Sequence, residues 1–156
     1  MSAIGGFFEA EAGLGPAQLC HPEALPVVFG RAAFRIILEQ LQPQCVWVPF
    51  YCCDALLKPL RLLRVPFRYY ALNAQLLPEL RELPEGDYAV VINYFGLQTE
   101  SLGQFAARWP GQLIIDNTQA FYESTFPGCY AFNSARKFFG VPDGCYLYSP
   151  ERLSVA

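Results

Sequence analysis

Short apolar runs alternate along the chain with stretches in which apolar residues recur at helical spacing. Most of these runs are almost continuously apolar, which is typical of strands covered on both faces of a sheet. The sequence predicts seven strands: Leu25 to Phe29, Cys45 to Pro49, Phe67 to Tyr70, Tyr88 to Tyr94, Gln112 to Asp116, Cys129 to Phe132 and Gly144 to Ser149. Strands that alternate with helices in this way indicate an α/β fold.

Three helices are predicted between these strands. The first follows Gly30, the second contains Pro59, which a helix tolerates near its first turn or at a kink, and the third takes Ser101 as its N-cap. Their apolar faces are, in turn, Phe34, Ile37, Leu38 and Leu41; Leu56, Leu57, Leu60 and Leu63; and Leu102, Phe105, Ala106 and Trp109. A short helix is also expected at Gln75 to Leu80, inside the surface connection from Leu72 to Asp87.

The composition agrees with one folded domain over residues 1–156. Hydrophobic residues make up 53% of the chain and charged residues 16%, the reverse of the balance in a disordered protein. The longest stretch without a charge runs from Gln40 to Cys53, and Pro43 and Pro49 interrupt it. A membrane helix needs about 18 apolar residues in a row, so we expect no membrane partner.

The charge pattern argues against nucleic acid as a partner. The net charge is −3, and the basic residues do not form the stripe that binding to a phosphate backbone requires. The N-terminus carries Glu9 and Glu11 where a signal peptide would have a basic start and an apolar core. The expected location is therefore the cytoplasm.

Six cysteines are then expected as reduced thiols, most of them small buried hydrophobic residues. Cys52 and Cys53 are adjacent, so both sulfurs cannot easily point at one ion, and no metal site is predicted. The single histidine, His21, follows Cys20 in a proline-flanked loop, where a surface position is expected. The alternative is a Cys/His nucleophilic pair, whose other partners the sequence does not reveal.

Three junctions between a strand and the next segment hold candidate chemistry, because ligands of open α/β sheets bind at the carboxyl ends of strands. Gly30 and Arg31 begin a helix, whose amide groups are a cradle for phosphate. Asp116 ends an apolar strand. Lys137 lies between two apolar strands, where burial and the neighbouring Arg136 would both favour the neutral, nucleophilic amine.

Together these groups fit pyridoxal 5′-phosphate. This cofactor needs an anion cradle, a lysine that bonds its aldehyde, and a carboxylate that keeps its ring nitrogen protonated. Gly30 with its helix, Lys137 and Asp116 supply them in turn. The alternative for each group is structural: Asp116 as a helix cap, Lys137 as a surface lysine, or the two as an ion pair in an α/β module without a cofactor.

Several motifs in this order resemble the DegT/StrS family of pyridoxal-phosphate-dependent aminotransferases. They are Ile4-Gly5-Gly6-Phe7-Phe8-Glu9, Phe29-Gly30-Arg31-Ala32-Ala33, Asn93-Tyr94-Phe95-Gly96, Asp116-Asn117-Thr118-Gln119-Ala120-Phe121, and the segment from Ser134 to Gly144. The resemblance implies a fold type I large domain, a three-layer α/β sandwich. Its seven-stranded sheet would be mostly parallel with one antiparallel strand, preceded by an extension over residues 1–24.

The resemblance also implies a role for each matching residue. Lys137 would form the aldimine with the cofactor, and Asp116 would pair with the pyridine nitrogen. Gln119 would lie near the phenolic oxygen, and Ser134 would bind the phosphate. Tyr51, within about two residues of register, would stack on the ring.

Arg31 stands where the family usually has threonine or serine, so it either binds the phosphate as a charged donor or points to solvent. By resemblance the activity is amino transfer from an amino-acid donor to a keto sugar attached to a nucleotide, in a homodimer. By the resemblance, residues 1–156 correspond to the large domain alone, without the small domain into which family members continue. The alternative is therefore a truncated domain that binds the cofactor or a partner without turnover.

Overall fold

The computed structural model describes residues 20–151 and 153. The motif from Ile4 to Glu9, and residues 1–19 of the predicted N-terminal extension, lie outside the described residues. Among the described residues, no helix has the length and apolar character needed to cross a membrane.

The fold is built on a seven-stranded sheet with the strand order β1-β7-β6-β5-β4-β2-β3. The strands are β1 (Leu25–Val27), β2 (Cys45–Pro49), β3 (Phe67–Tyr70), β4 (Asp87–Ile92), β5 (Leu113–Asn117), β6 (Tyr130–Asn133) and β7 (Cys145–Tyr148). Strand β7 is antiparallel to both of its neighbours, and every other pair in the sheet is parallel. The predicted mostly parallel sheet with one antiparallel strand is therefore confirmed.

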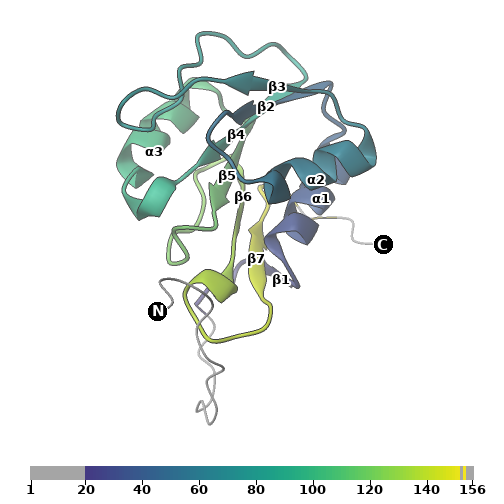
Figure 1. Cartoon of the computed structure of the whole chain (residues 1–156), viewed down its shortest axis with the longest axis vertical. Coiled ribbons are helices and arrows are strands. Elements are labelled where there is room, and N and C mark those ends of the chain that lie inside the picture. Colours follow the sequence, from purple (N-terminus) through teal and green to yellow (C-terminus); the bar gives the residue numbers. More distant parts are fainter. Residues whose placement is uncertain (1–19, 152, 154–156) are drawn as a thin grey trace, which may run out of the picture.

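Helices cover both faces of the sheet, which makes the predicted three-layer sandwich. Helices α1 (Gly30–Leu41) and α2 (Asp54–Leu63) lie on one face, and α3 (Thr99–Arg108) lies on the other (Figure 1). Two short 3₁₀ turns, η1 (Tyr94–Gly96) and η2 (Ala135–Lys137), follow strands β4 and β6. Both turns therefore lie at the carboxyl edge of the sheet, where a ligand site of this class of fold is expected.

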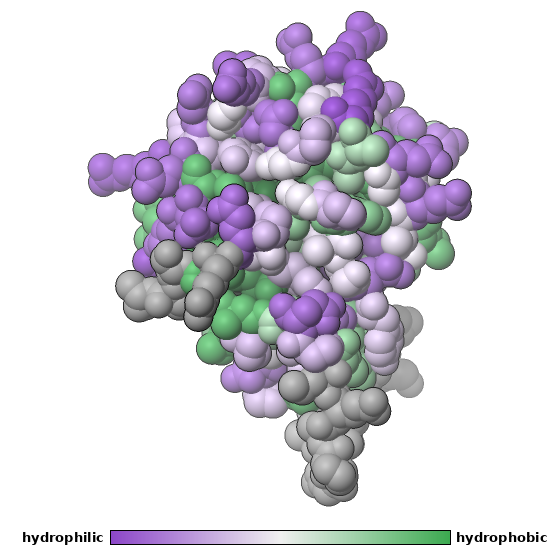
Figure 2. All heavy atoms as spheres, turned by 180° about the vertical axis from the view of Figure 1, so that it is seen from behind, coloured by the Kyte–Doolittle hydropathy of each residue, from purple (hydrophilic) through white to green (hydrophobic). Residues whose placement is uncertain are grey.

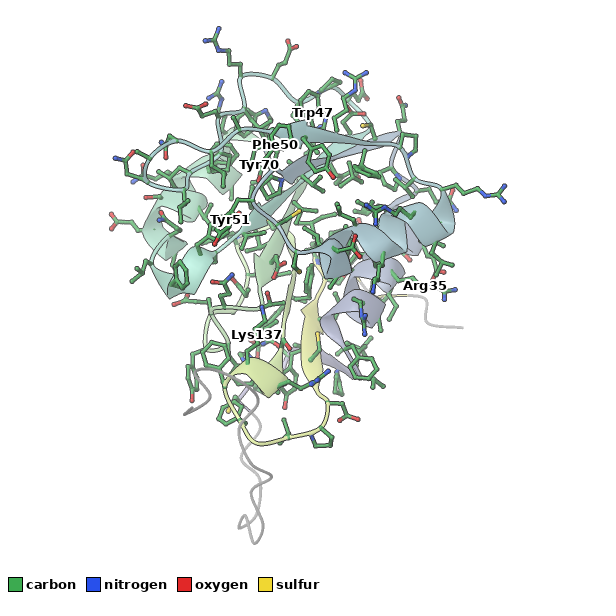
Figure 3. All side chains as sticks on the ribbon, viewed as in Figure 1. Arg35, Trp47, Phe50, Tyr51, Tyr70 and Lys137 are labelled. Atoms are coloured by element: carbon green, nitrogen blue, oxygen red, sulfur yellow. The ribbon has the colours of Figure 1, made fainter. Side chains whose placement is uncertain are left out.

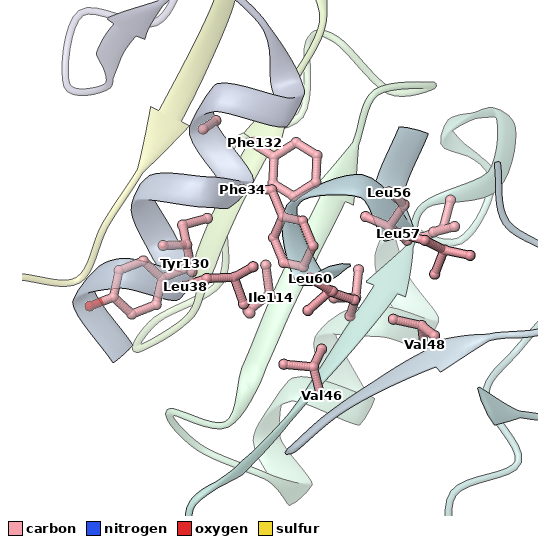
Figure 4. Packing of buried hydrophobic residues seen from close by; sticks show 14 of the residues in the cluster. Phe34, Leu38, Val46, Val48, Leu56, Leu57, Leu60, Ile114, Tyr130 and Phe132 are labelled. Atoms are coloured by element: carbon pink, nitrogen blue, oxygen red, sulfur yellow. The ribbon is translucent and has the colours of Figure 1, made fainter. Parts of the chain in front are cut away.

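The larger hydrophobic cluster lies between the sheet and helices α1 and α2. Phe34 of α1 stacks on Phe132 of β6, with ring centroids 5.7 Å apart, and Leu60 of α2 is fully buried. Figure 4 shows these residues packed against Val46, Val48 and Ile114 of the strands. Both helices present one apolar face at the spacing that the sequence predicts, because residues three and four apart lie on the same side of a helix.

A second cluster lies on the opposite face of the sheet, under α3. Leu102, Ala106 and Trp109 pack there against buried residues of the strands, among them Val91 and Ile115. The core is thus divided in two by the sheet, as strands apolar on both faces require.

The surface seen from behind carries hydrophilic side chains, with hydrophobic patches between them (Figure 2).

The expected short helix from Gln75 to Leu80 is wrong. The segment is a turn in which the Asn73 side-chain oxygen accepts hydrogen bonds from the backbone amides of Gln75 and Leu77, 2.9 and 3.0 Å away. Leu76 takes a left-handed backbone conformation, with φ of 61°. Asparagine side chains bond nearby amides in this way and compete with helix formation.

Two details of the predicted helices also differ. Helix α3 begins at Thr99, so Ser101 is not its N-cap, and the amide of Gln98 bonds the side-chain oxygen of Asn93 instead, 3.1 Å away. Pro59 is the sixth residue of α2, beyond its first turn. Its ring leaves the carbonyl of Ala55 without the usual helical donor.

Candidate functional site

A cavity of about 190 Å³ opens at the carboxyl edge of the sheet. It lies between the N-termini of α1 and α2, the ends of β5 and β6, and the turn η2. Five of the predicted site residues line it: Gly30, Arg31, Asp116, Ser134 and Lys137. The topology brings these residues together from segments that are more than 100 positions apart, because the carboxyl ends of parallel strands meet at one edge.

Asp116 is the most buried acidic group of the cavity, with 6% of its surface exposed. One carboxylate oxygen accepts a hydrogen bond from the backbone amide of Thr118, 2.9 Å away. Burial raises the pKa of Asp116 above its ordinary value of 3.8, while hydrogen bonds from Thr118 and the positive charge of Lys137 act in the opposite direction. A cationic ligand group at this position would favour the ionised form.

Lys137 extends from η2 and donates a hydrogen bond from Nζ to the hydroxyl of Thr118, 3.2 Å away. The expected burial of this lysine is wrong, since its side chain is exposed at the mouth of the cavity. The aromatic residues that follow it, Phe138 and Phe139, pack against Phe121 and leave Lys137 uncovered. An exposed amine at the rim is accessible to a carbonyl compound that enters the cavity.

The N-terminus of α1 forms another wall. A Cβ atom on Gly30 would lie 3.4 Å from both the carbonyl oxygen of Asn133 and the ring of Phe132, in close van der Waals contact with both. The amides of Ala32 and Ala33 bond the carbonyl of Phe29, 2.9 and 3.0 Å away, so the amides of Gly30 and Arg31 are the ones that can offer donors to an anion. Arg31 is exposed, and its guanidinium lies 6.0 Å from the centre of the Phe29 ring.

Tyr51 and Gln119 are not among the residues that line the cavity. Tyr51 is 63% exposed and stacks on Tyr94, with ring centroids 5.6 Å apart. Figure 3 shows it apart from Lys137. The Gln119 side-chain oxygen accepts a hydrogen bond from the amide of Phe95, 3.3 Å away.

Thr118 and Cys53 line the cavity but were not singled out from the sequence as site residues. Thr118 contacts both titratable groups, through its amide to Asp116 and its hydroxyl to Lys137. Its position two residues after the strand-terminal aspartate was the available signal, because such a residue lies within reach of the carboxylate. Cys53 is two residues beyond Tyr51, within the register error of that prediction, and is exposed.

The cysteines and the histidine differ in part from expectation. All six cysteines are reduced thiols, but only Cys129 and Cys145 are buried, while Cys20 and Cys53 are exposed. The surface position expected for His21 is wrong, because only 4% of it is exposed. Its two ring nitrogens bond Tyr148 and Asn133, which leaves no ring nitrogen to activate a thiol. The described residues contain no group of three or more potential metal ligands.

A scan against protein families and a search of curated proteins find no match to this chain. Solved structures do resemble it. The sugar aminotransferase CalS13 from Micromonospora echinospora is 15% identical, with a TM-score of 0.62, and the match covers 83% of this chain and 42% of that one. A DegT DnrJ EryC1 StrS aminotransferase from Brucella abortus is 15% identical, with a TM-score of 0.55, and the match covers 82% and 42%.

Another similar structure has a different named activity. The L-threonine-O-3-phosphate decarboxylase from Porphyromonas gingivalis is 14% identical, with a TM-score of 0.62, over 82% of this chain and 45% of that one. The chain therefore spans less than half the length of these proteins. At such identities the likeness establishes the fold, and the chain has the α/β fold seen in aminotransferases.

Proposed function

We propose that the cavity binds pyridoxal 5′-phosphate, and that the chain belongs to the DegT/StrS aminotransferases and takes part in amino transfer. The observation that supports this most directly is the pairing of a buried carboxylate with an accessible lysine in one cavity. Asp116 and Lys137 both contact Thr118, through its amide and its hydroxyl. A structural ion pair does not need a cavity beside it, whereas a cofactor site does.

The residues present fit the cofactor in three respects. The N-terminus of α1 offers backbone donors to a phosphate, and Gly30 places no side chain of its own beside them. Ser134 and Arg31 line the same cavity and are proposed as further phosphate donors. The buried Asp116 is the proposed partner of the protonated ring nitrogen, because a cation there relieves the cost of burying a carboxylate.

When bound, the cofactor supplies an electron sink for the bonds at the substrate amino carbon. Lys137 would bond the cofactor aldehyde through Nζ and later hold and return a proton at that atom. Thr118 would orient the lysine through its hydroxyl. Asp116 would keep its negative charge directed at the ring. Gln119 and Tyr51 remain proposed cofactor contacts that the lining of the cavity does not include.

The proposed reaction transfers an amino group from an amino acid to a keto sugar, which a nucleotide carries. Two similar structures support the sugar, since one is a sugar aminotransferase and another is a GDP-4-keto-6-deoxymannose-3-dehydratase with bound GDP-perosamine. We also propose a homodimer and a cytoplasmic location, with residues 1–156 as one domain. Exposed aromatic residues at the carboxyl edge, among them Phe50 and Phe95, support pairing through that region.

Amino transfer can be tested through its first half-reaction, in which the amino acid donates its amino group to the cofactor. The chain is loaded with pyridoxal 5′-phosphate, incubated with individual amino acids, and the released cofactor is analysed by mass. We expect the amine form of the cofactor with at least one amino acid, none with Lys137→Ala, and an unchanged yield with Lys58→Ala, the other of the two lysines in the sequence. Cofactor binding without any amine form would favour the alternative, a domain that binds without turnover.

A further inference from the structure

His21 is buried among aromatic rings far from it in the sequence. It belongs to the segment that precedes β1, and 4% of its surface is exposed. The ring lies 4.9 Å from the ring of Phe121 and 4.8 Å from that of Tyr146, between centroids. Its Nδ1 bonds the hydroxyl of Tyr148, and its Nε2 lies 3.3 Å from the side-chain nitrogen of Asn133. A buried imidazole with both nitrogens engaged has a defined protonation state.

The orientation of the Asn133 amide decides that state. Its oxygen accepts the backbone N–H of Tyr146, 2.9 Å away, and only an oxygen accepts from that donor. The side-chain nitrogen therefore faces the other way. It donates to the carbonyl of Phe121 and lies within hydrogen-bond distance of His21 Nε2, each 3.3 Å away.

A hydrogen bond from this amide to Nε2 requires Nε2 to be the unprotonated nitrogen of the ring. In neutral imidazole the other nitrogen then carries the proton, so Nδ1–H donates to the hydroxyl of Tyr148. A charged imidazolium would place an N–H on Nε2 against an N–H of Asn133. Two donors face to face form no hydrogen bond, so protonation breaks this contact.

Asn133 joins this contact to the candidate site. It is the last residue of β6, directly before Ser134 and the turn η2 that carries Lys137. Its carbonyl oxygen borders the space beside Gly30 at the start of α1. The histidine thus holds the residue from which the lysine turn begins.

We propose that His21 is a positioning residue, neutral and protonated on Nδ1, which ties the segment before β1 to Asn133, and that protonation of Nε2 releases this tie and loosens the turn carrying Lys137. The proposal does not depend on the cofactor. It makes the order of the site sensitive to pH through the only histidine of the chain.

Five groups face His21 from the elements packed around it. From β7 these are Tyr146 and Tyr148, from β6 Asn133, from the loop after β5 Phe121, and from its own segment Glu23. Burial lowers the pKa of His21, and the carbonyl of Phe121 and the charge of Glu23 oppose this to a smaller extent. Glu23 is the one carboxylate in this set, so it is the group to remove in a control.

Nitrogen NMR of the untagged, cofactor-free chain tests the tautomer directly, since a single imidazole is present. We expect the signal of an unprotonated Nε2 and a protonated Nδ1 at neutral pH, with a titration midpoint below the ordinary value of about 6.5. A protonated Nε2 at neutral pH, or a midpoint above that value, would overturn the proposal.

Asn133→Asp tests the coupling. Aspartate keeps an acceptor for Tyr146 but turns the group facing Nε2 into an anion, so the midpoint of His21 should rise above that of the parent. Below about pH 6, hydrogen exchange in peptides covering residues 134–139 should be faster in the parent than in Asn133→Asp. In the parent it should also be faster in these peptides than in those covering residues 113–117. Glu23→Gln should lower the midpoint without changing the tautomer. An unchanged midpoint in Asn133→Asp, or exchange in η2 that does not follow His21 protonation, would contradict the proposal.

Discussion

Lys137 donates a hydrogen bond from Nζ to the hydroxyl of Thr118, 3.2 Å away. The same threonine donates its backbone N–H to Asp116, 2.9 Å away. The residue directly after β5 therefore contacts both the accessible amine and the buried carboxylate of the cavity. The positive charge of Lys137 also lowers the pKa of Asp116, against the effect of burial.

Replacing Asp116 with asparagine should raise the free energy of unfolding of the cofactor-free chain and weaken its binding of pyridoxal 5′-phosphate. Burial raises the pKa of Asp116, so between its ordinary value of 3.8 and the raised one the folded chain binds more protons than the unfolded chain. The free energy of unfolding therefore falls as the pH rises through this window. The Asp116→Asn substitution removes that loss while keeping an oxygen for the Thr118 amide.

The same substitution removes the charge proposed to face the cofactor ring. We expect pyridoxal 5′-phosphate to bind about ten- to a hundredfold more weakly, the size of a hydrogen bond to a charged group. Urea unfolding across pH and an absorbance titration measure the two effects. A variant that is less stable at neutral pH and binds equally well would refute the assigned role of Asp116.

Alkylation of the Cys53 thiol can report whether the cavity is occupied. Its thiol is exposed and lines the cavity, whereas Cys20 is exposed elsewhere. At a cofactor concentration about ten times the dissociation constant, roughly a tenth of the sites are empty, and alkylation of Cys53 should slow about tenfold. Mass mapping should find Cys20 unaffected. Equal protection of both thiols would mean that the cofactor acts away from this cavity.

The buried thiols serve as an internal reference for that measurement. Burial raises the pKa of Cys129 to about 11 and that of Cys145 to about 12. Their thiolate fraction at neutral pH is very small, and we expect neither to react until the chain unfolds.

Helix α2 offers a matched pair of leucines for testing the packing that holds Cys53 in place. Leu60 is fully buried against the sheet, and Leu62 is 66% exposed on the same helix. Leu60→Ala should lower the free energy of unfolding by about 2–5 kcal/mol. Leu62→Ala should change it by less than about 0.5 kcal/mol. Urea unfolding of both variants checks this, and similar losses in the two would mean that α2 packs through another face.

The sheet and the positions of two candidate site residues were predictable because they depend on local patterns. Strand β5 begins with a continuous apolar run, and Asp116 is the first polar position after that run. The position of Gly30 at the start of α1 follows from helical spacing in the same way. Such patterns persist in the sequence because burial on both faces demands them.

Features that rest on contacts distant in the sequence were not predictable. The burial of His21 requires Tyr148, which is 127 positions away. The exposure of Lys137 follows from Phe138 and Phe139 packing against Phe121 instead of covering it. The turn after Asn73 replaces a helix because the Asn73 side chain bonds two backbone amides. The spacing of apolar residues does not reveal such a contact.

The most direct measurement of the central claim is covalent trapping of pyridoxal 5′-phosphate. The chain is mixed with the cofactor, reduced with borohydride, digested and mapped by mass. The sequence holds two lysines, Lys58 and Lys137, so only these and the N-terminal amine compete. Lys58 lies exposed on α2, 4.0 Å from Asp54.

The account predicts that the adduct forms on Lys137, persists in Lys58→Ala, and weakens in Asp116→Asn. An adduct spread equally over Lys58 and the N-terminal amine, or one that forms on Lys137 only in the unfolded chain, would contradict the assignment of this cavity as a cofactor site.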